Sequence, residues 1–244
     1  MQTLSQNYKD YTTADFEVWR ILFERQMAQL PPLATEAYLT GIEKIGFSAD
    51  KIPDFNEINP KLKAITGWQL TVVPGLIDNK PFFEFLQNKF FCSSTWLRKP
   101  EHLDYLEEPD MFHDVFGHVP LLTNQAFVDY LAALASIALK HISDEWVIER
   151  IARIYWYTVE FGLIKENGLK IYGAGILSSA GESQYSLFSE IPQRVPYNIA
   201  EIMDTPYIKE RFQEKYFVID SYEQLFHSIP AIEKRIEQSL INSR

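Results

Sequence analysis

The sequence predicts one mostly α-helical domain with a few short strands over residues 1–244, of which 1–11 are expected to form a loose N-terminal tail. Three observations indicate this fold. Long stretches carry apolar residues at helical spacing behind capping residues, and one short stretch alternates in a β-branched pattern. No low-complexity linker, repeat or charge block divides the chain. With 244 residues, 46% of them hydrophobic and 14% aromatic, the chain can bury a large core.

The first part of the chain is expected to form four helices and two extended segments. Thr12 or Thr13 caps a helix over 14–29, and Gly46 ends a second helix over 34–45. A third helix over 56–66 is ended by Gly67, and Pro81 opens a short Phe-rich helix over 82–88. Residues 68–73 alternate as a strand does, and residues 90–97 are expected to be extended.

Three longer helices are expected in the second part. Asn124 caps the first, which runs to about 141, and Ser143 or Asp144 caps the next, which continues to about 165. The last begins after Ser221, carries a capping box with Gln224 and is kinked by Pro230. Because it has no long heptad repeat, we expect a monomer or dimer and no coiled-coil tetramer.

Charge and cysteine content exclude several classes of protein. The formal net charge of -10 repels nucleic-acid phosphates and anionic membranes, so we expect no nucleic-acid or membrane partner. The lone Cys92 excludes an internal disulfide and Cys-rich zinc modules, and it is expected to be a small buried hydrophobe. The N-terminus lacks the pattern of a signal peptide and no apolar run reaches membrane-spanning length, so the expected location is the cytoplasm.

Residues 109–120 contain two histidines five positions apart, His113 and His118. Two imidazoles on one segment are a possible beginning of a metal site. On an α-helix, however, positions i and i+5 lie about 140° apart around the axis, so the segment must break or bend for both rings to meet one ion. Gly117 and Pro120 permit such a break. The alternative is two partly buried histidines packed among apolar neighbours.

Glu160 lies within an aromatic run of the helix expected to continue to 165, on one face with Trp156 and Ile164. A buried carboxylate needs a partner. Arg150 and Arg153 are poorly spaced to provide one, which favours a metal. Two histidines and one carboxylate hold Fe(II) in oxygen-activating enzymes, and zinc hydrolases can use the same set. The chain lacks a His-Glu-x-x-His motif, which disfavours hydrolysis without excluding it.

The pattern Pro109-Asp110-x-x-His113-Asp114-x-x-Gly117-His118-Val119-Pro120 resembles the iron-binding signature of the pterin-dependent aromatic amino acid hydroxylases. Residues 73–76, 96–98, 154–162 and 172–179 match the same family in the same order, so the resemblance covers nearly the whole chain. It implies a single catalytic domain of the aromatic amino acid hydroxylase type. Within the family, the chain is most similar to the short bacterial phenylalanine hydroxylases.

The resemblance implies an oxidoreductase in which His113, His118 and Glu160 hold Fe(II). A tetrahydropterin, tetrahydrobiopterin or a relative, would supply two electrons, and a ferryl-oxo species formed from O2 would convert L-phenylalanine to L-tyrosine. Pterin carbinolamine dehydratase and dihydropteridine reductase would regenerate the pterin. Tryptophan hydroxylation is the alternative within the family, and a zinc-dependent hydrolase is the alternative outside it.

The resemblance also assigns an amino-acid site, in a cleft between the histidine segment, the Glu160 helix and a Gly-Ser loop. Arg98 would grip the substrate carboxylate and Asp110 would orient it, although Arg98 could also be a surface cation. Trp156 would wall the ring pocket or simply belong to the core, and one serine of a pair would hold a ligand imidazole. The residues that match this site are Arg98, Asp110, Pro109, Trp156, Gly175, Ser178 and Ser179.

For the pterin, the resemblance implies that Phe82 stacks on the bicycle and that residues 75–77 offer backbone hydrogen bonds. Asp114 would face the pterin and act with Glu160 in catalysis, although many relatives carry the longer Glu there. Leu106 departs from the hydroxyl residue of animal members, and Glu182 is a candidate support of the active-site loop. The residues that match the pterin site are Gly75, Leu76, Ile77, Phe82, Asp114 and Tyr155.

Overall fold

The predicted signals at Thr12, Gly46 and Gly67 are confirmed, but Pro81 does not open the fourth helix, which already begins at Asn79 after Asp78. This computed structural model describes residues 4–104 and 108–242, so Leu106 lies outside the described residues. Thr12 forms a capping box with Asp15, and Gly46 and Gly67 each adopt a φ of 82° just after a helix. The helices before the histidine segment are α1 (Thr13–Met27), α2 (Glu36–Ile45), α3 (Phe55–Ile65) and α4 (Asn79–Gln87).

The N-terminal segment is attached to the rest of the protein from Gln6 onward. The Gln6 amide donates to the carbonyl of Pro53 at 2.8 Å, and the Tyr11 hydroxyl donates to the carbonyl of Thr95 at 2.8 Å. These two hydrogen bonds join Gln6 and Tyr11 to segments that are far away in the sequence. Residues 1–3 lie outside the described part of the chain.

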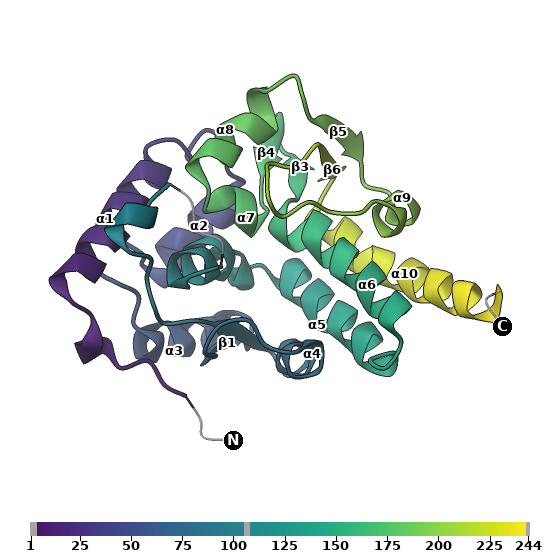
Figure 1. Cartoon of the computed structure of the whole chain (residues 1–244), viewed down its shortest axis with the longest axis horizontal. Coiled ribbons are helices and arrows are strands. Elements are labelled where there is room, and N and C mark those ends of the chain that lie inside the picture. The colour runs from purple at the N-terminus through teal and green to yellow at the C-terminus, as the bar shows by residue number, and fades with distance from the viewer. Residues whose placement is uncertain (1–3, 105–107, 243–244) are drawn as a thin grey trace.

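Two small sheets lie on opposite sides of the molecule (Figure 1). Parallel strands β1 (Gln69–Val72) and β2 (Phe90–Ser93) confirm the extended segments expected there. The second sheet was not predicted, and its strand β3 lies where a helix to residue 165 was expected. In this sheet only the β3–β4 pair is antiparallel. Its spatial order is β4 (Leu169–Ile171), β3 (Leu163–Lys165), β6 (Lys215–Ile219) and β5 (Gln193–Pro196).

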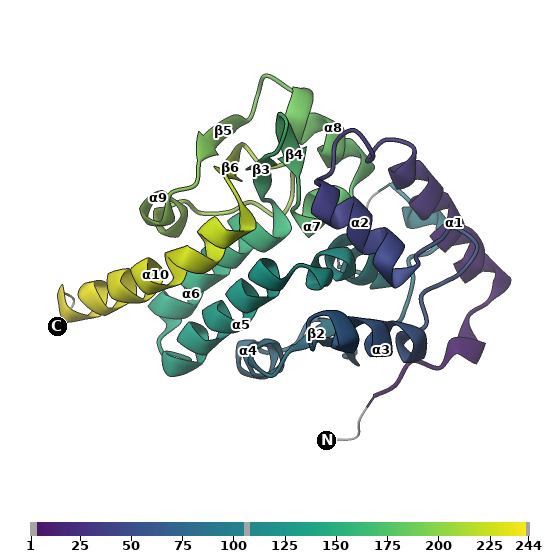
Figure 2. The same ribbon diagram turned by 180° about the vertical axis from the view of Figure 1, so that it is seen from behind.

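Three helices lie side by side in both views (Figures 1 and 2). These are α5 (Gln125–Lys140), α6 (Glu145–Tyr155) and α10 (Tyr222–Asn242). The shorter helical elements are η1 (Tyr8–Asp10), η2 (Pro100–His102), η4 (Val119–Thr123), α7 (Ala174–Leu177), α8 (Ala180–Phe188) and α9 (Ile199–Asp204). At the start of α10, Ser221 accepts from the amide of Gln224, whose side chain accepts from the amide of Asp220. Pro230 lies within α10.

The helix expected to continue to 165 ends ten residues earlier. After Tyr155, the chain forms the π-helix η5 (Trp156–Glu160), turns at Phe161 and enters β3. The prediction that Ile164 shares a helical face with Glu160 is therefore wrong. Ile164 instead pairs with Ile219 of β6 and with Lys170 of β4, so its backbone bonding is supplied by the sheet.

One cluster of buried apolar side chains runs from Val18 in α1 to Ile236 in α10 and joins the helices to both sheets. The thiol of Cys92 is buried, as expected. Within residues 4–104 and 108–242, no single helix has the length and apolarity needed to cross a membrane. The segments 112–123 and 125–140 meet that criterion only jointly, with a bend of 112° between them.

Candidate metal centre and active site

His113 and His118 meet because their segment is a π-helix, η3 (Phe112–His118). The i→i+5 bonding of a π-helix places residues five apart one turn above each other, which an α-helix does not. The two Nε2 atoms are 3.4 Å apart. The expected break or bend near Gly117 takes the form of a widened helical turn, which ends at His118 and continues into η4. Gly117 has another function: a Cβ at that position would lie 2.9 Å from the carbonyl oxygen of Ala174 in α7.

Glu160 ends the second π-helix and faces both histidines. Its Oε1 lies 3.3 Å from Nε2 of His118, and its Oε2 lies 3.6 Å from Nε2 of His113. The two arginines considered as alternative partners, Arg150 and Arg153, both pair with Glu149 on the exposed side of α6. The carboxylate is thus directed at the imidazoles, as a metal ligand would be.

The three donors form a compact and nearly buried set. One ligand atom from each of His113, His118 and Glu160 lies within 4.8 Å of the others, and the side chains are 19%, 4% and 14% exposed. Burial alone raises the pKa of Glu160, but the two imidazoles outweigh it and hold this pKa below its ordinary value. Burial lowers the pKa of His113. Both shifts favour an ionised carboxylate and a neutral imidazole, which are the forms that bind metals.

Ser178 fixes the tautomer of His113. The Ser178 hydroxyl donates to the carbonyl of Ala174 at 2.8 Å, so it must accept from Nδ1–H of His113 at 3.0 Å. Nε2 of His113 then carries the lone pair toward Glu160, the arrangement that second-sphere partners of metal-bound histidines impose. The other serine of the pair, Ser179, caps α8 by accepting from the amide of Glu182.

Arg98 and Asp110 form a buried ion pair beside the cluster. Nε and Nη2 of Arg98 each lie 2.9 Å from one oxygen of Asp110, whose side chain is fully buried. The same carboxylate accepts from the backbone amide of His113 at 3.1 Å. The alternative of Arg98 as a surface cation is wrong, since its side chain is only 9% exposed.

Trp156 lies in an aromatic group that the sequence had revealed only in part. Its ring stacks on Tyr207 with centroids 4.6 Å apart and packs against Phe161 at 4.7 Å. Gly175 adjoins this group, because a Cβ there would lie 2.7 Å from Phe161. Tyr207 follows α9 in a segment without helix or strand, so no periodicity marked it. Pro109 directly precedes the buried Asp110 and is half-buried.

Phe82 and Tyr155, assigned to the pterin side, contact each other edge to face at 5.6 Å. Residues Gly75 to Ile77 lie in the loop between β1 and α4, where Leu76 is 80% exposed. Asp114 is held by the amide of Ser94, which donates to Oδ2 at 2.8 Å. Of the residues assigned to the pterin, Phe82 and Tyr155 are therefore in contact. Asp114 is bonded to the residue that follows β2.

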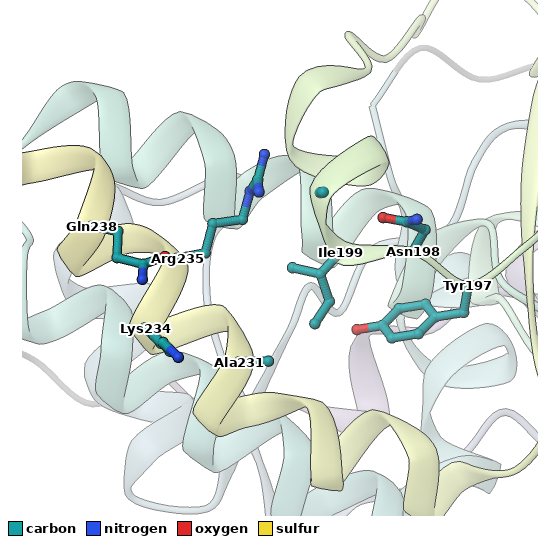
Figure 3. Close-up of a pocket in the computed structure, with 8 residues that line it drawn as sticks. Tyr197, Asn198, Ile199, Ala231, Lys234, Arg235 and Gln238 are labelled. Atoms are coloured by element: carbon teal, nitrogen blue, oxygen red, sulfur yellow. The ribbon is translucent and has the colours of Figure 1, made fainter. Parts of the chain in front are cut away.

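A separate hollow lies between α9 and α10 (Figure 3). None of the residues predicted from the sequence to bind metal, substrate or pterin lines it. Its lining residues are Tyr197, Asn198, Ile199, Ala200, Ala231, Lys234, Arg235 and Gln238.

Comparisons with known proteins agree with this geometry. A model of the family "biopterin-dependent aromatic amino acid hydroxylase" matches residues 5–242. The phenylalanine-4-hydroxylases of Ralstonia nicotianae and Chromobacterium violaceum are each 49% identical over 225 residues, which cover 92% of this chain and 72% and 75% of theirs.

Solved structures of the Chromobacterium violaceum enzyme share the fold. One with bound Fe(III) has a TM-score of 0.94 at 46% identity and covers 99% of this chain and 88% of its own. Another, with iron(III) and 7,8-dihydrobiopterin, has a TM-score of 0.91 at 47% identity and covers 97% and 86%. The chain belongs to the biopterin-dependent aromatic amino acid hydroxylase family.

Proposed function

We propose that this protein hydroxylates L-phenylalanine to L-tyrosine with O2, and that it uses Fe(II) and a tetrahydropterin. The observation that carries the proposal is the cluster of His113, His118 and Glu160, whose ligand atoms lie within 4.8 Å of one another. Relatives that are 49% identical are named phenylalanine-4-hydroxylases, and one of them was solved with iron(III) and 7,8-dihydrobiopterin.

The donor set fits iron. Two neutral imidazoles and one carboxylate are the ligands of oxygen-activating Fe(II) sites, and three protein ligands leave coordination positions for other molecules. When bound, iron and a tetrahydropterin would supply the activation of O2 and the two electrons that the hydroxylation needs. The protein must keep the Glu160 carboxylate ionised and the imidazoles neutral. The bond from His113 to Ser178 and the contacts of Glu160 with both histidines favour these forms.

Arg98 is prepared to bind the substrate carboxylate. Asp110 accepts from Nε and from one hydrogen of Nη2. The second hydrogen of Nη2 and the two hydrogens of Nη1 are then donors that a second carboxylate can use. Asp110 also accepts from the backbone amide of Arg98 at 2.9 Å, so the carboxylate that pairs with the guanidinium is itself held in place. We assign the aromatic group of Trp156, Tyr207 and Phe161 as the wall against which the substrate ring packs.

The pterin site is assigned to Phe82, Tyr155, Asp114 and the loop 75–77. Phe82 provides an aromatic face for a flat bicycle, and Tyr155 packs against Phe82 edge to face. The loop provides backbone donors and acceptors. The hydrogen bond from Ser94 uses one oxygen of Asp114 and so fixes the direction of the other. The shorter side chain of Asp is thereby held in one orientation.

The test is tyrosine formation from phenylalanine by metal-free protein, with Fe(II) and a tetrahydropterin added separately and together under air. We expect product only when both are present. Competition with tryptophan then measures the substrate preference. No tyrosine under any condition, together with one zinc ion bound per chain, would contradict the proposal and favour a zinc hydrolase. Cytoplasmic location, the two pterin-recycling partners and a monomeric or dimeric state stay predictions.

A further inference from the structure

Gln213 is the one buried residue of a segment whose other residues are exposed or half-buried. Residues 205–214 form neither helix nor strand, and within them only Gln213 is buried, with 2% of its surface exposed. The same segment carries Tyr207, which stacks on Trp156. A buried amide in a surface loop needs hydrogen-bond partners for its donors and its acceptor. These partners indicate which parts of the protein Gln213 positions.

The orientation of the Gln213 amide is determined by its neighbours. Its Oε1 accepts from the indole Nε1–H of Trp156 at 3.0 Å, and its Nε2 donates to the carbonyl of Ile208 at 2.7 Å. An indole N–H can only donate and a carbonyl can only accept, so a flipped amide would lose both bonds. Gln213 therefore fixes the Trp156 ring and, through Ile208, the part of the segment next to Tyr207.

Glu182 holds Gln213 in turn. Its Oε1 accepts from the backbone amide of Gln213 at 3.2 Å and from the hydroxyl of Tyr216 at 2.7 Å. Glu182 is only 6% exposed and lies in the first turn of α8, three residues after Ser179, the N-cap of that helix. The preceding residue, Ser178, is the C-cap of α7 and bonds to His113. The partner of His113 and the support of the aromatic group therefore lie close together in the chain, on either side of the junction between α7 and α8.

We propose that Gln213 and Glu182 are positioning residues of the amino-acid site, which hold the rings of Trp156 and Tyr207 in place as the wall for the substrate side chain. The inference rests on the proposed function, since it takes that wall to be the one that contacts the substrate ring. Gln213 acts through Trp156, and Glu182 acts through the backbone of Gln213. Neither residue is required to hold the metal.

The test is Gln213→Leu, which keeps the volume of the side chain and removes both of its hydrogen bonds. The Kd for L-phenylalanine is measured by calorimetry on iron-loaded protein without pterin, so that no turnover occurs. KM, kcat, iron content and preference for phenylalanine over tryptophan are measured on the complete system. We expect Kd and KM to rise about tenfold, the equivalent of one net hydrogen bond, with a loss of substrate preference, unchanged iron content and kcat within about threefold.

Two further variants separate positioning from a general loss of stability. Gln224→Leu makes the same chemical change at the start of α10, where the side chain bonds to the backbone of Asp220, and should leave Kd unchanged. Trp156→Phe removes the indole donor, so Gln213→Leu should add less than about threefold in that background.

An unchanged Kd in Gln213→Leu would overturn the proposal. So would a Gln213→Leu change that raises Kd as much in the Trp156→Phe background as in the unaltered protein. A lower midpoint of unfolding with unchanged Kd would show that Gln213 only stabilises the fold. The proposed function fails separately: in that case the unaltered protein forms no tyrosine with iron and pterin present. If the unaltered protein does form tyrosine and Kd does not respond to Gln213→Leu, only the positioning role is lost.

Discussion

Replacing Glu182 by Gln should remove part of the pH dependence of folding stability. Burial raises the pKa of this carboxyl group from 4.5 to about 7, although the hydrogen bonds from Tyr216 and Gln213 oppose the shift. A carboxyl group whose pKa is higher in the folded state binds protons more tightly there than in the unfolded chain. Stability therefore falls as pH rises from about 4.5 to about 7 and levels off above that range.

The size of the effect follows from the two pKa values. One unit of pKa corresponds to about 1.4 kcal/mol, so the full shift amounts to on the order of 3 kcal/mol. Between pH 5.5 and pH 8, the ionisation of Glu182 should lower the free energy of unfolding by about 2 kcal/mol. Gln at this position keeps an oxygen that can accept from both Tyr216 and Gln213, and it does not titrate.

The assay is urea denaturation of the unaltered protein and of Glu182→Gln at several pH values from 5.5 to 8, both with a chelator present. Because His113 and Glu160 titrate in both proteins, their contributions cancel in the difference between the two curves. The difference should change by about 2 kcal/mol in favour of the variant as pH rises. Glu223→Gln, on the exposed side of α10, is the control. Parallel curves for Glu182→Gln and the unaltered protein would refute the reasoning.

Three further variants test the metal and substrate sites. Glu160→Gln should reduce iron affinity by more than the roughly 10- to 100-fold that is typical of losing a residue that only hydrogen-bonds a metal ligand. Circular dichroism should show that the fold is retained. Full iron binding would show that the carboxylate is not a metal ligand. Ser178→Ala should weaken iron binding by about 10- to 100-fold, because His113 loses the partner that fixes its tautomer, and unchanged affinity in a metal-competition titration would contradict this. Arg98→Lys keeps a cation for Asp110 but loses the fork, so KM for phenylalanine should rise about tenfold or more with iron still bound; an unchanged KM would place the carboxylate clamp elsewhere.

Local chemistry made much of this protein predictable from the sequence. Thr12, Gly46 and Gly67 act within one helical turn of their own positions, so the helix ends they predict do not depend on the rest of the fold. The identities of His113, His118 and Glu160 likewise indicated a metal site, because an isolated buried carboxylate is costly and two nearby histidines offer a common partner.

Tertiary contacts decided how those ligands meet. The sequence of the histidine segment is compatible with an α-helix, and only the packed structure shows the wider turn that aligns His113 with His118. The close approach of Gly117 to Ala174 belongs to the same packing. Glu160 similarly depends on a π-helix that ends α6 early, where the chain leaves the helix to pair with β6.

The aromatic wall and its anchor could not be predicted from sequence for a related reason. Tyr207 and Gln213 lie in a segment with no periodicity, and their partners Trp156 and Glu182 are 51 and 31 positions away in the chain. Propensity and capping act over a few residues, whereas these contacts join segments that are far apart in the sequence. The sequence by itself determined the candidate metal ligands, most of the helix signals and the family. The tertiary structure alone decided the π-helical alignment of the ligands and the closure of the site around Trp156.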